Sequence, residues 1–155
     1  MKTYIAETFR FNDAANKLVL AKIREIPENG ECIRYFSHLI NSMNKWMARI
    51  KQSSGYVDLD WWLPEYRLDE LEAKWNACLD IWLDYINRLS EEQLLVEVEF
   101  VGFDGGTFAA TPKDIALQLN YHSIHHRAQI VYLIRQQGIA PDFIDYIGTR
   151  YRKIS

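Results

Sequence analysis

Hydrophobic residues recur three or four positions apart along most of this 155-residue chain. That spacing places them on one face of an α-helix. It predicts four long helices, over residues 2–26, 31–51, 64–88 and 111–137. Four helices with short or moderate connections predict an all-α fold, an antiparallel four-helix bundle. No repeat, linker or low-complexity tract divides the chain, so residues 1–155 are expected to form a single domain.

Between the third and fourth predicted helices the hydrophobic period changes to two. Apolar side chains alternate there with Glu97 and Glu99, and a glycine-rich turn, Asp104–Gly106, follows. The apolar positions are Val96, Val98 and Phe100. This alternation predicts a small β-hairpin within Gln93–Thr111, before the last helix.

Three local signals mark where the predicted helices begin and end. Pro64 suits the first turn of the third helix, because its missing N–H has no helical partner there in any case. Thr111 is an N-cap residue with Pro112 behind it, and Gly138 is a typical stop for the fourth helix.

Composition and charge narrow the function classes. The net charge is −3 and there is no basic stripe, which argues against a nucleic-acid surface. The N-terminus lacks a signal-peptide pattern and no run of about 18 apolar residues is present, so a cytoplasmic protein without a membrane span is expected. Cys32 and Cys78 form no CxxC pair and are expected to be buried, reduced thiols.

Three of the four histidines lie within five residues of each other on the predicted last helix. His122 and His126 are about 40° apart on the helical wheel, on the same arc as the apolar Ile115 and Leu119. Two imidazoles at this spacing on an inward face can reach one metal ion. They can equally be buried histidines that hydrogen-bond to their neighbours. His125 falls on the shoulder of that arc.

The fourth histidine, His38, lies at the edge of the apolar face of the predicted second helix, beside Tyr35 and Ser42. If the bundle brings this edge against the last helix, three histidines from two helices form a site with open coordination positions. The zinc-protease pattern is absent because Ser123 follows His122 where that pattern needs glutamate. The di-iron pattern is absent because no glutamate stands three residues before a histidine.

At these residues the chain resembles the DinB family of small helical bundle proteins. The likeness is carried by three stretches and covers nearly the whole chain. They are "FRFNDAANKLVL", "HLINSMNKW" and "NYHSIHHRAQIVYLIRQQGIAPDFIDYI". The last stretch resembles the most recognisable segment of the family, a His-His-Arg run ahead of a glycine stop and a proline. Ala128 stands where the family usually has glycine, which leaves the histidines unaffected.

The resemblance implies a four-helix bundle, commonly a homodimer, that holds a divalent metal ion with three histidines. Carried over to this chain, the ligands are His38, His122 and His126, and His125 is only their neighbour. Histidine ligation suits zinc or nickel first, and manganese or iron after them. The sequence does not identify a catalytic residue.

Characterised relatives resemble metal-dependent transferases that use a low-molecular-weight thiol on a small electrophile, in stress response or detoxification. A metal-dependent hydrolase and a non-enzymatic metal-binding bundle are the alternatives. Gln129, Tyr35 and Trp46 are expected to line the pocket for a cofactor or small-molecule substrate, together with the Trp61–Trp62 loop. For each of these side chains, a place in the ordinary core is the competing interpretation.

One further pattern predicts a partner subunit. A set of apolar side chains lies on the side of the last helix opposite its histidines. The set is Leu117, Ile124, Ala128 and Val131. A helix that is apolar on two faces is buried on two faces. A second copy of the chain would cover this face in a homodimer, and the hairpin and C-terminal tail are the alternative cover.

Overall fold

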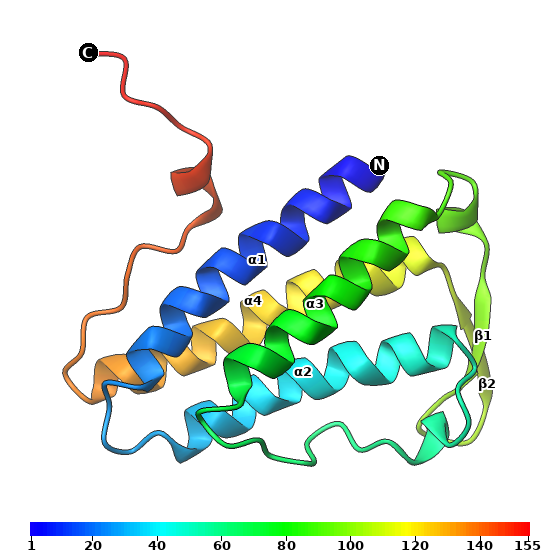
Figure 1. The fold of residues 1–155 in the computed structure, drawn as a ribbon, viewed down its shortest axis with the longest axis horizontal. Helices are drawn as coiled ribbons and strands as arrows, with labels where there is room; N and C mark the ends of the chain where they lie inside the picture. Colours follow the sequence, from blue (N-terminus) through cyan, green and yellow to red (C-terminus); the bar gives the residue numbers. More distant parts are fainter.

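The computed structural model describes residues 1–155 and contains four long helices and one hairpin (Figure 1). The helices are α1 (Lys2–Ile23), α2 (Gly30–Ile50), α3 (Leu71–Arg88) and α4 (Pro112–Gln136), and the strands are β1 (Val98–Val101) and β2 (Thr107–Ala110). Single helical turns occur at Tyr56–Asp58, Gln93–Leu95 and Tyr146–Thr149. The predicted helical bundle with a hairpin before its last helix is confirmed.

The helices pack so that α1 and α2 each contact both α3 and α4. In Figure 1, α1 and α4 run one way and α2 and α3 run the other way. Because α2 and α3 run in the same direction, residues 51–70 must return along the length of α2 before α3 begins. This long return places a loop beside α2, next to its contact with α4.

The hairpin pairs β1 with β2 in antiparallel register, from Val98 opposite Ala110 to Val101 opposite Thr107. The strands are shorter than the alternating pattern, because Gln93–Leu95 forms a helical turn ahead of them. Tertiary contacts join β1 to α2. The hairpin therefore covers one end of α2 and then leads into α4.

The start of α4 follows the predicted capping pattern. The Thr111 hydroxyl accepts the Asp114 backbone N–H at 3.1 Å, and Pro112 occupies the first helical position. At the other end, Gly138 has a φ of +79°, a left-handed conformation that glycine adopts without a steric penalty. Both predicted ends of the helix are confirmed.

The predicted start of the third helix at Pro64 is wrong, since α3 begins at Leu71. Side chains of α2 bind the backbone of the intervening segment. Asn41 Nδ2 donates to the Pro64 carbonyl at 3.1 Å, and the Tyr66 N–H donates to Ser37 Oγ at 3.0 Å. These tertiary hydrogen bonds replace the helical ones that the local pattern favours.

The core is a single cluster of 25 buried apolar residues contributed by all four helices. Trp82 is fully buried in this cluster, stacks on Phe9 and donates its indole N–H to the Met43 carbonyl at 3.0 Å. Cys32 and Cys78 are buried within the cluster. Burial raises the pKa of the Cys32 thiol to about 11 and that of Cys78 to about 12, so both stay protonated near neutral pH.

The C-terminal segment leaves α4 and runs back past α1 (Figure 1). Tyr146 meets Phe11 of α1 edge to face at 5.1 Å, and Arg150 pairs with Glu7 at 3.1 Å. The tail does not seal the apolar face of α4, because Ile124 remains 45% exposed there. The homodimer stays a prediction. No helix has the length and hydropathy needed to cross a bilayer.

Candidate metal centre

Three histidines meet where α2 packs against α4. His38 Nε2 lies 3.0 Å from His122 Nε2, and His126 Nε2 lies 2.9 Å from the same atom. The donor atoms of the three rings all lie within 4.8 Å of one another. His38 and His126 are buried and His122 is half-buried. The i, i+4 spacing on α4 and the facing position on α2 account for this cluster.

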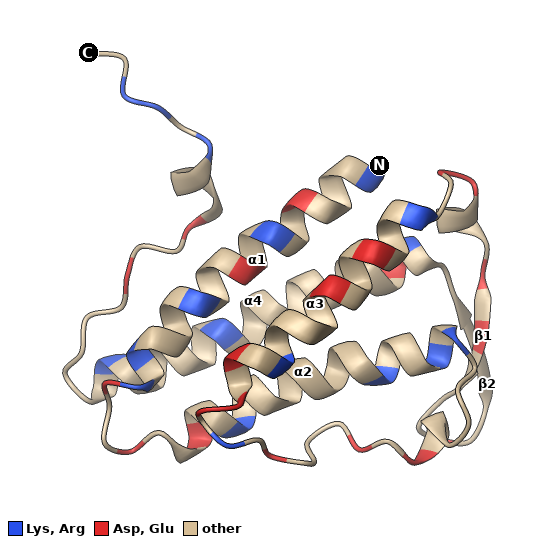
Figure 2. Ribbon diagram, viewed as in Figure 1, with Lys and Arg blue, Asp and Glu red and all other residues tan.

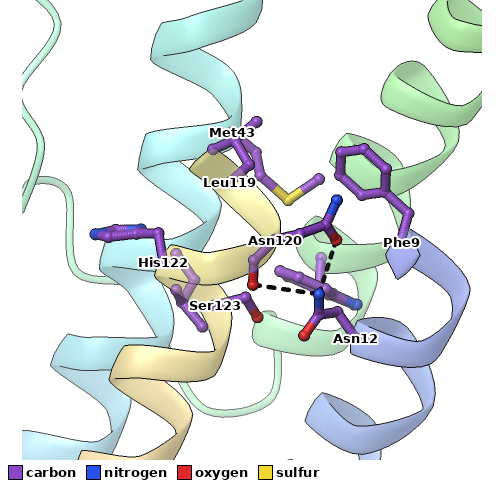
Figure 3. Close-up of a pocket in the computed structure, with 9 residues that line it drawn as sticks. Phe9, Asn12, Met43, Leu119, Asn120, His122 and Ser123 are labelled. Atoms are coloured by element: carbon purple, nitrogen blue, oxygen red, sulfur yellow. Dashed lines mark hydrogen bonds between the residues drawn. The ribbon is translucent and has the colours of Figure 1, made fainter. Parts of the chain in front are cut away.

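Figure 3 shows that His122 and a second polar region lie on different sides of α4. The His122 ring leaves α4 on the side of α2, whereas Asn120 approaches Asn12 of α1 on the other side. His125 is exposed, its ring lies 4.9 Å from that of His126, and it does not belong to the three-histidine group.

Hydrogen bonds outside the cluster fix the protons of two of the rings. His38 Nδ1 lies 2.7 Å from the Trp61 carbonyl oxygen, and His126 Nδ1 lies 2.6 Å from Gln129 Oε1. Both oxygens are acceptors, so each Nδ1 carries the proton. The Nε2 atoms of His38 and His126 consequently present lone pairs to the centre of the cluster.

The centre of the cluster therefore has more acceptors than donors. His122 Nε2 carries at most one proton, and it faces the Nε2 lone pairs of both His38 and His126. In a neutral cluster, a proton on His122 Nε2 can form a hydrogen bond to only one of its two neighbours. The other neighbour's Nε2 lone pair then lies at hydrogen-bond distance from His122 Nε2 with no proton between them. One cation at the centre would satisfy all three nitrogens.

The distances from His122 Nε2 to the other two nitrogens fit a shared metal ion. Two nitrogens that bind one ion at about 2.1 Å lie about 3.0 to 3.4 Å apart at octahedral or tetrahedral angles. The distances of 2.9 and 3.0 Å match this range to within a few tenths of an ångström. The bond of His38 to the Trp61 carbonyl also fits, because metal-bound histidines typically donate their other ring N–H to a carboxylate, a backbone carbonyl or water.

The environment keeps the three rings neutral. The pKa of His122 is lowered to about 4, first by burial and then by the neighbouring histidines. Burial likewise lowers the pKa of His126 to about 4, against the opposing effect of its bond to Gln129. The pKa of His38 is also lowered, first by burial. Neutral imidazole is the form that binds a metal ion.

Aromatic rings enclose two of the three histidines. Trp62 stacks on His38 with ring centroids 3.9 Å apart, and Tyr35 stacks on His126 at 5.4 Å. Asp60 holds the turn before Trp62 by accepting the N–H groups of Trp62 at 2.6 Å and of Leu63 at 2.9 Å. Sequence reasoning missed Asp60, although an aspartate two residues before the bonded N–H is a recognised turn pattern.

Polar side chains of α2 form hydrogen bonds to the backbone of the loop that carries Trp61 and Trp62. Besides His38 and Asn41, Lys45 donates to the Val57 carbonyl at 3.4 Å and to the Leu59 carbonyl. These contacts fall one helical turn apart, so one stripe of α2 holds the loop backbone. No sequence pattern marks Lys45, because its acceptors are carbonyls of an irregular segment.

A groove of about 510 Å³ lies between α2 and α4, and none of the three clustered histidines lines it. Its lining includes Tyr35 and Gln129, the two predicted pocket residues that contact His126, and also His125 and Glu31. The third predicted pocket residue, Trp46, lies elsewhere, packed against Trp61 and Phe100. The pocket roles of all three side chains stay predictions.

On the opposite side of α4, Arg127 forms a buried network with α1. Its Nη1 donates to Asn12 Oδ1 at 2.7 Å and to Asn16 Oδ1 at 2.9 Å. Asn16 Nδ2 donates to Ser123 Oγ at 2.9 Å. Asn12 Nδ2 donates to Asn120 Oδ1 at 2.7 Å, as Figure 3 shows. A cavity of about 10 Å³ beside it has room for about one water molecule.

The chain belongs to the DinB superfamily, whose family model matches residues 10–130. The match runs from α1 into α4 and includes all three clustered histidines. Comparison with curated proteins and with solved structures found no match for this chain. The DinB family is metal-binding in general, and the three-histidine group of this member could hold a metal ion.

Proposed function

We propose that His38, His122 and His126 hold one divalent metal ion, and that the protein is a metal-dependent transferase. It transfers a low-molecular-weight thiol to a small electrophile. The observation that carries the metal site is the convergence of three Nε2 atoms, two of which have their Nδ1 protons committed to Trp61 and Gln129. Uncommitted lone pairs in a buried cluster favour a cation there.

The donor set favours catalysis over a purely structural role. Three protein ligands leave coordination positions for a substrate, whereas structural zinc sites are closed by four. A divalent ion held by neutral imidazoles keeps its full positive charge and lowers the pKa of a thiol or water that it binds. Family resemblance, rather than geometry, selects the thiol.

Residues around the histidines have separate tasks in this proposal. The Trp61 carbonyl and Gln129 fix the tautomers of His38 and His126, and the rings of Trp62 and Tyr35 exclude water from the imidazole faces. The groove beside Tyr35 and Gln129 receives the small electrophile. The protein's own cysteines take no part, because both are buried and protonated.

Cobalt substitution tests the thiol step directly. Cobalt-loaded protein is titrated with cysteine, glutathione and 2-mercaptoethanol, and the visible and near-ultraviolet spectrum is followed. The proposal predicts a thiolate-to-cobalt band for at least one thiol, together with thiol-dependent conversion of chlorodinitrobenzene. His125→Ala should keep the thiolate-to-cobalt band, because His125 is outside the three-histidine group, whereas His126→Ala should show neither signal.

Two other results would favour one of the alternative functions over the transferase. Ester hydrolysis that requires metal and ignores added thiol would indicate the hydrolase. A cobalt spectrum that responds to no thiol, together with no turnover of either substrate type, would indicate a non-enzymatic metal-binding bundle.

A further inference from the structure

Three cations of this chain are buried without a carboxylate partner. Lys45 is 7% exposed, Arg49 is 6% exposed and Arg127 is 4% exposed. Both signs of charge occur on every helix (Figure 2), and all ten ion pairs are made by other, more exposed groups. A buried charge needs a partner or a set of hydrogen bonds to offset its lost hydration.

Two of the three cations have such hydrogen bonds, and Arg49 largely lacks them. Arg127 donates to two asparagine oxygens, and Lys45 donates to two backbone carbonyls. Arg49 makes one hydrogen bond, a long contact of 3.3 Å from Nη2 to the Val101 carbonyl. Its buried Nε–H has no acceptor.

Aromatic rings surround the Arg49 guanidinium. Its Cζ lies 4.7 Å from the ring centre of Trp46, 4.8 Å from that of Phe100 and 5.0 Å from that of Trp61. Ring faces attract a cation, but they offer no acceptor to the N–H groups at the guanidinium edge. The charge is consequently stabilised while most of its hydrogen-bonding capacity is unused.

A pocket of about 290 Å³ opens onto this guanidinium, and we call it the Arg49 pocket. It is lined by Trp46, Arg49, Trp61, Phe100, Gly102, Phe103 and Phe108, with no acidic residue among them. Phe103 at the hairpin is 96% exposed, an unusual state for a phenylalanine beside an apolar pocket. At Gly102 an added Cβ would lie 2.3 Å from the Phe108 ring, so glycine allows Phe108 to lie in the wall.

From this arrangement we infer that the Arg49 pocket binds a small aromatic carboxylate. The carboxylate pairs with the guanidinium of Arg49, and the flat apolar body lies against the surrounding rings. Charge complementarity selects an anion, since the lining carries one cation and no acid. The aromatic walls and the exposed Phe103 select an apolar body over a hydrophilic one.

This pocket is separate from the histidine cluster, although Trp61 belongs to both. The Trp61 carbonyl accepts from His38, while its ring forms part of the pocket wall. Binding of a carboxylate at Arg49 does not require a metal ion at the histidines. The two claims are therefore tested separately, with metal-free protein used for the pocket.

Calorimetric titration of metal-free protein with benzoate tests the inference. Benzoate should bind saturably, and benzyl alcohol, which has the same ring but no charge, should bind at least about tenfold more weakly. Acetate, which has the charge but no ring, should also bind at least about tenfold more weakly. Equal binding of benzoate and benzyl alcohol, or no benzoate binding, would overturn the inference without any variant.

Two variants then locate the binding site. Arg49→Met keeps an apolar stem and removes the charge, and it should weaken benzoate binding at least about tenfold. Phe103→Ser alters an exposed side chain, should leave the helical circular dichroism unchanged, and should weaken binding about threefold or more. Lys74→Met removes a matched cation that lies over Tyr66, outside the pocket, and should leave binding unchanged. Unchanged binding in both pocket variants would contradict the assignment.

Discussion

Buried polar groups occupy both sides of α4, but their hydrogen bonds differ. On the side of α1, the donors of Arg127 meet the oxygens of Asn12 and Asn16. On the side of α2, the Nε2 lone pairs of His38 and His126 converge on one nitrogen of His122. In the first network, each donor that is directed into the interior has an acceptor. The second has more acceptors than donors.

This difference separates a structural network from a binding site. A matched buried network fixes the packing of its helices and needs nothing from outside the chain. A buried cluster with surplus lone pairs lowers stability unless a cation completes it. Because both networks lie on one helix of one family member, variants on the two faces can be compared in the same protein.

The largest effect is expected on the matched side. Arg127→Met leaves the oxygens of Asn12 and Asn16 unpaired in the interior, and should lower the free energy of unfolding by about 2 to 5 kcal/mol. Urea denaturation of metal-free protein measures this change. Arg135→Met, at an exposed position on the same helix, is the control and should change stability by less than about 0.5 kcal/mol. A loss below about 1 kcal/mol for Arg127→Met would show that the network is not structural.

On the histidine side, stability should depend on metal. Zinc at about 100 times its dissociation constant should raise the unfolding free energy of wild type by about 2.7 kcal/mol. His126→Ala should lose most of this gain, while His125→Ala should keep it, because His125 is exposed and outside the group. Thermal unfolding with and without zinc measures the difference. Equal zinc stabilisation of wild type and His126→Ala would remove His126 from the site.

Gln129→Leu should have a smaller effect on the histidine side of α4. The substitution removes the acceptor of the His126 Nδ1 proton at nearly constant volume, and should weaken metal binding about 10- to 100-fold. Competition with a chelator gives the affinity. Gln136→Leu, an exposed position further along α4, should leave the affinity unchanged. If both variants bind alike, Gln129 does not orient the ligand.

The acid dependence of the metal-free protein tests the same side of α4 without a metal ion. Burial lowers the pKa of His122 and His126 from 6.5 to about 4, so between these values the unfolded chain binds more protons than the folded chain. Stability should therefore fall as the pH drops from about 6.5 towards about 4. Melting temperatures in chelator across this range measure the slope, and His122→Gln should flatten it. An unchanged slope in that variant would mean that other groups titrate.

The parts of the site that were predictable are those that depend on one helix. The i, i+4 pair His122 and His126 follows from the helical period, and so does the separation of Arg127 from the histidine face. That His38 would face them was a hypothesis about packing, and the family resemblance supported it. The contacts themselves depend on how α2 lies against α4.

The parts that were not predictable depend on contacts between distant segments. The start of α3 moved to Leu71 because Ser37 and Asn41 hold the preceding backbone, which no local pattern records. Trp46 lies with Phe100 rather than with the histidines because the hairpin folds onto the end of α2. The environment of Arg49 could not be predicted for the same reason, because Phe100 of the hairpin packs against its guanidinium.

The metal content of untagged protein tests the central claim most directly. Mass spectrometry of wild type and His38→Ala, each also measured after zinc addition and dialysis, gives the number of ions per chain. The account predicts about one ion per chain in wild type and almost none in His38→Ala, since the site needs ligands from both helices. Metal retained in the variant, or no metal in wild type even after zinc is added, would contradict it.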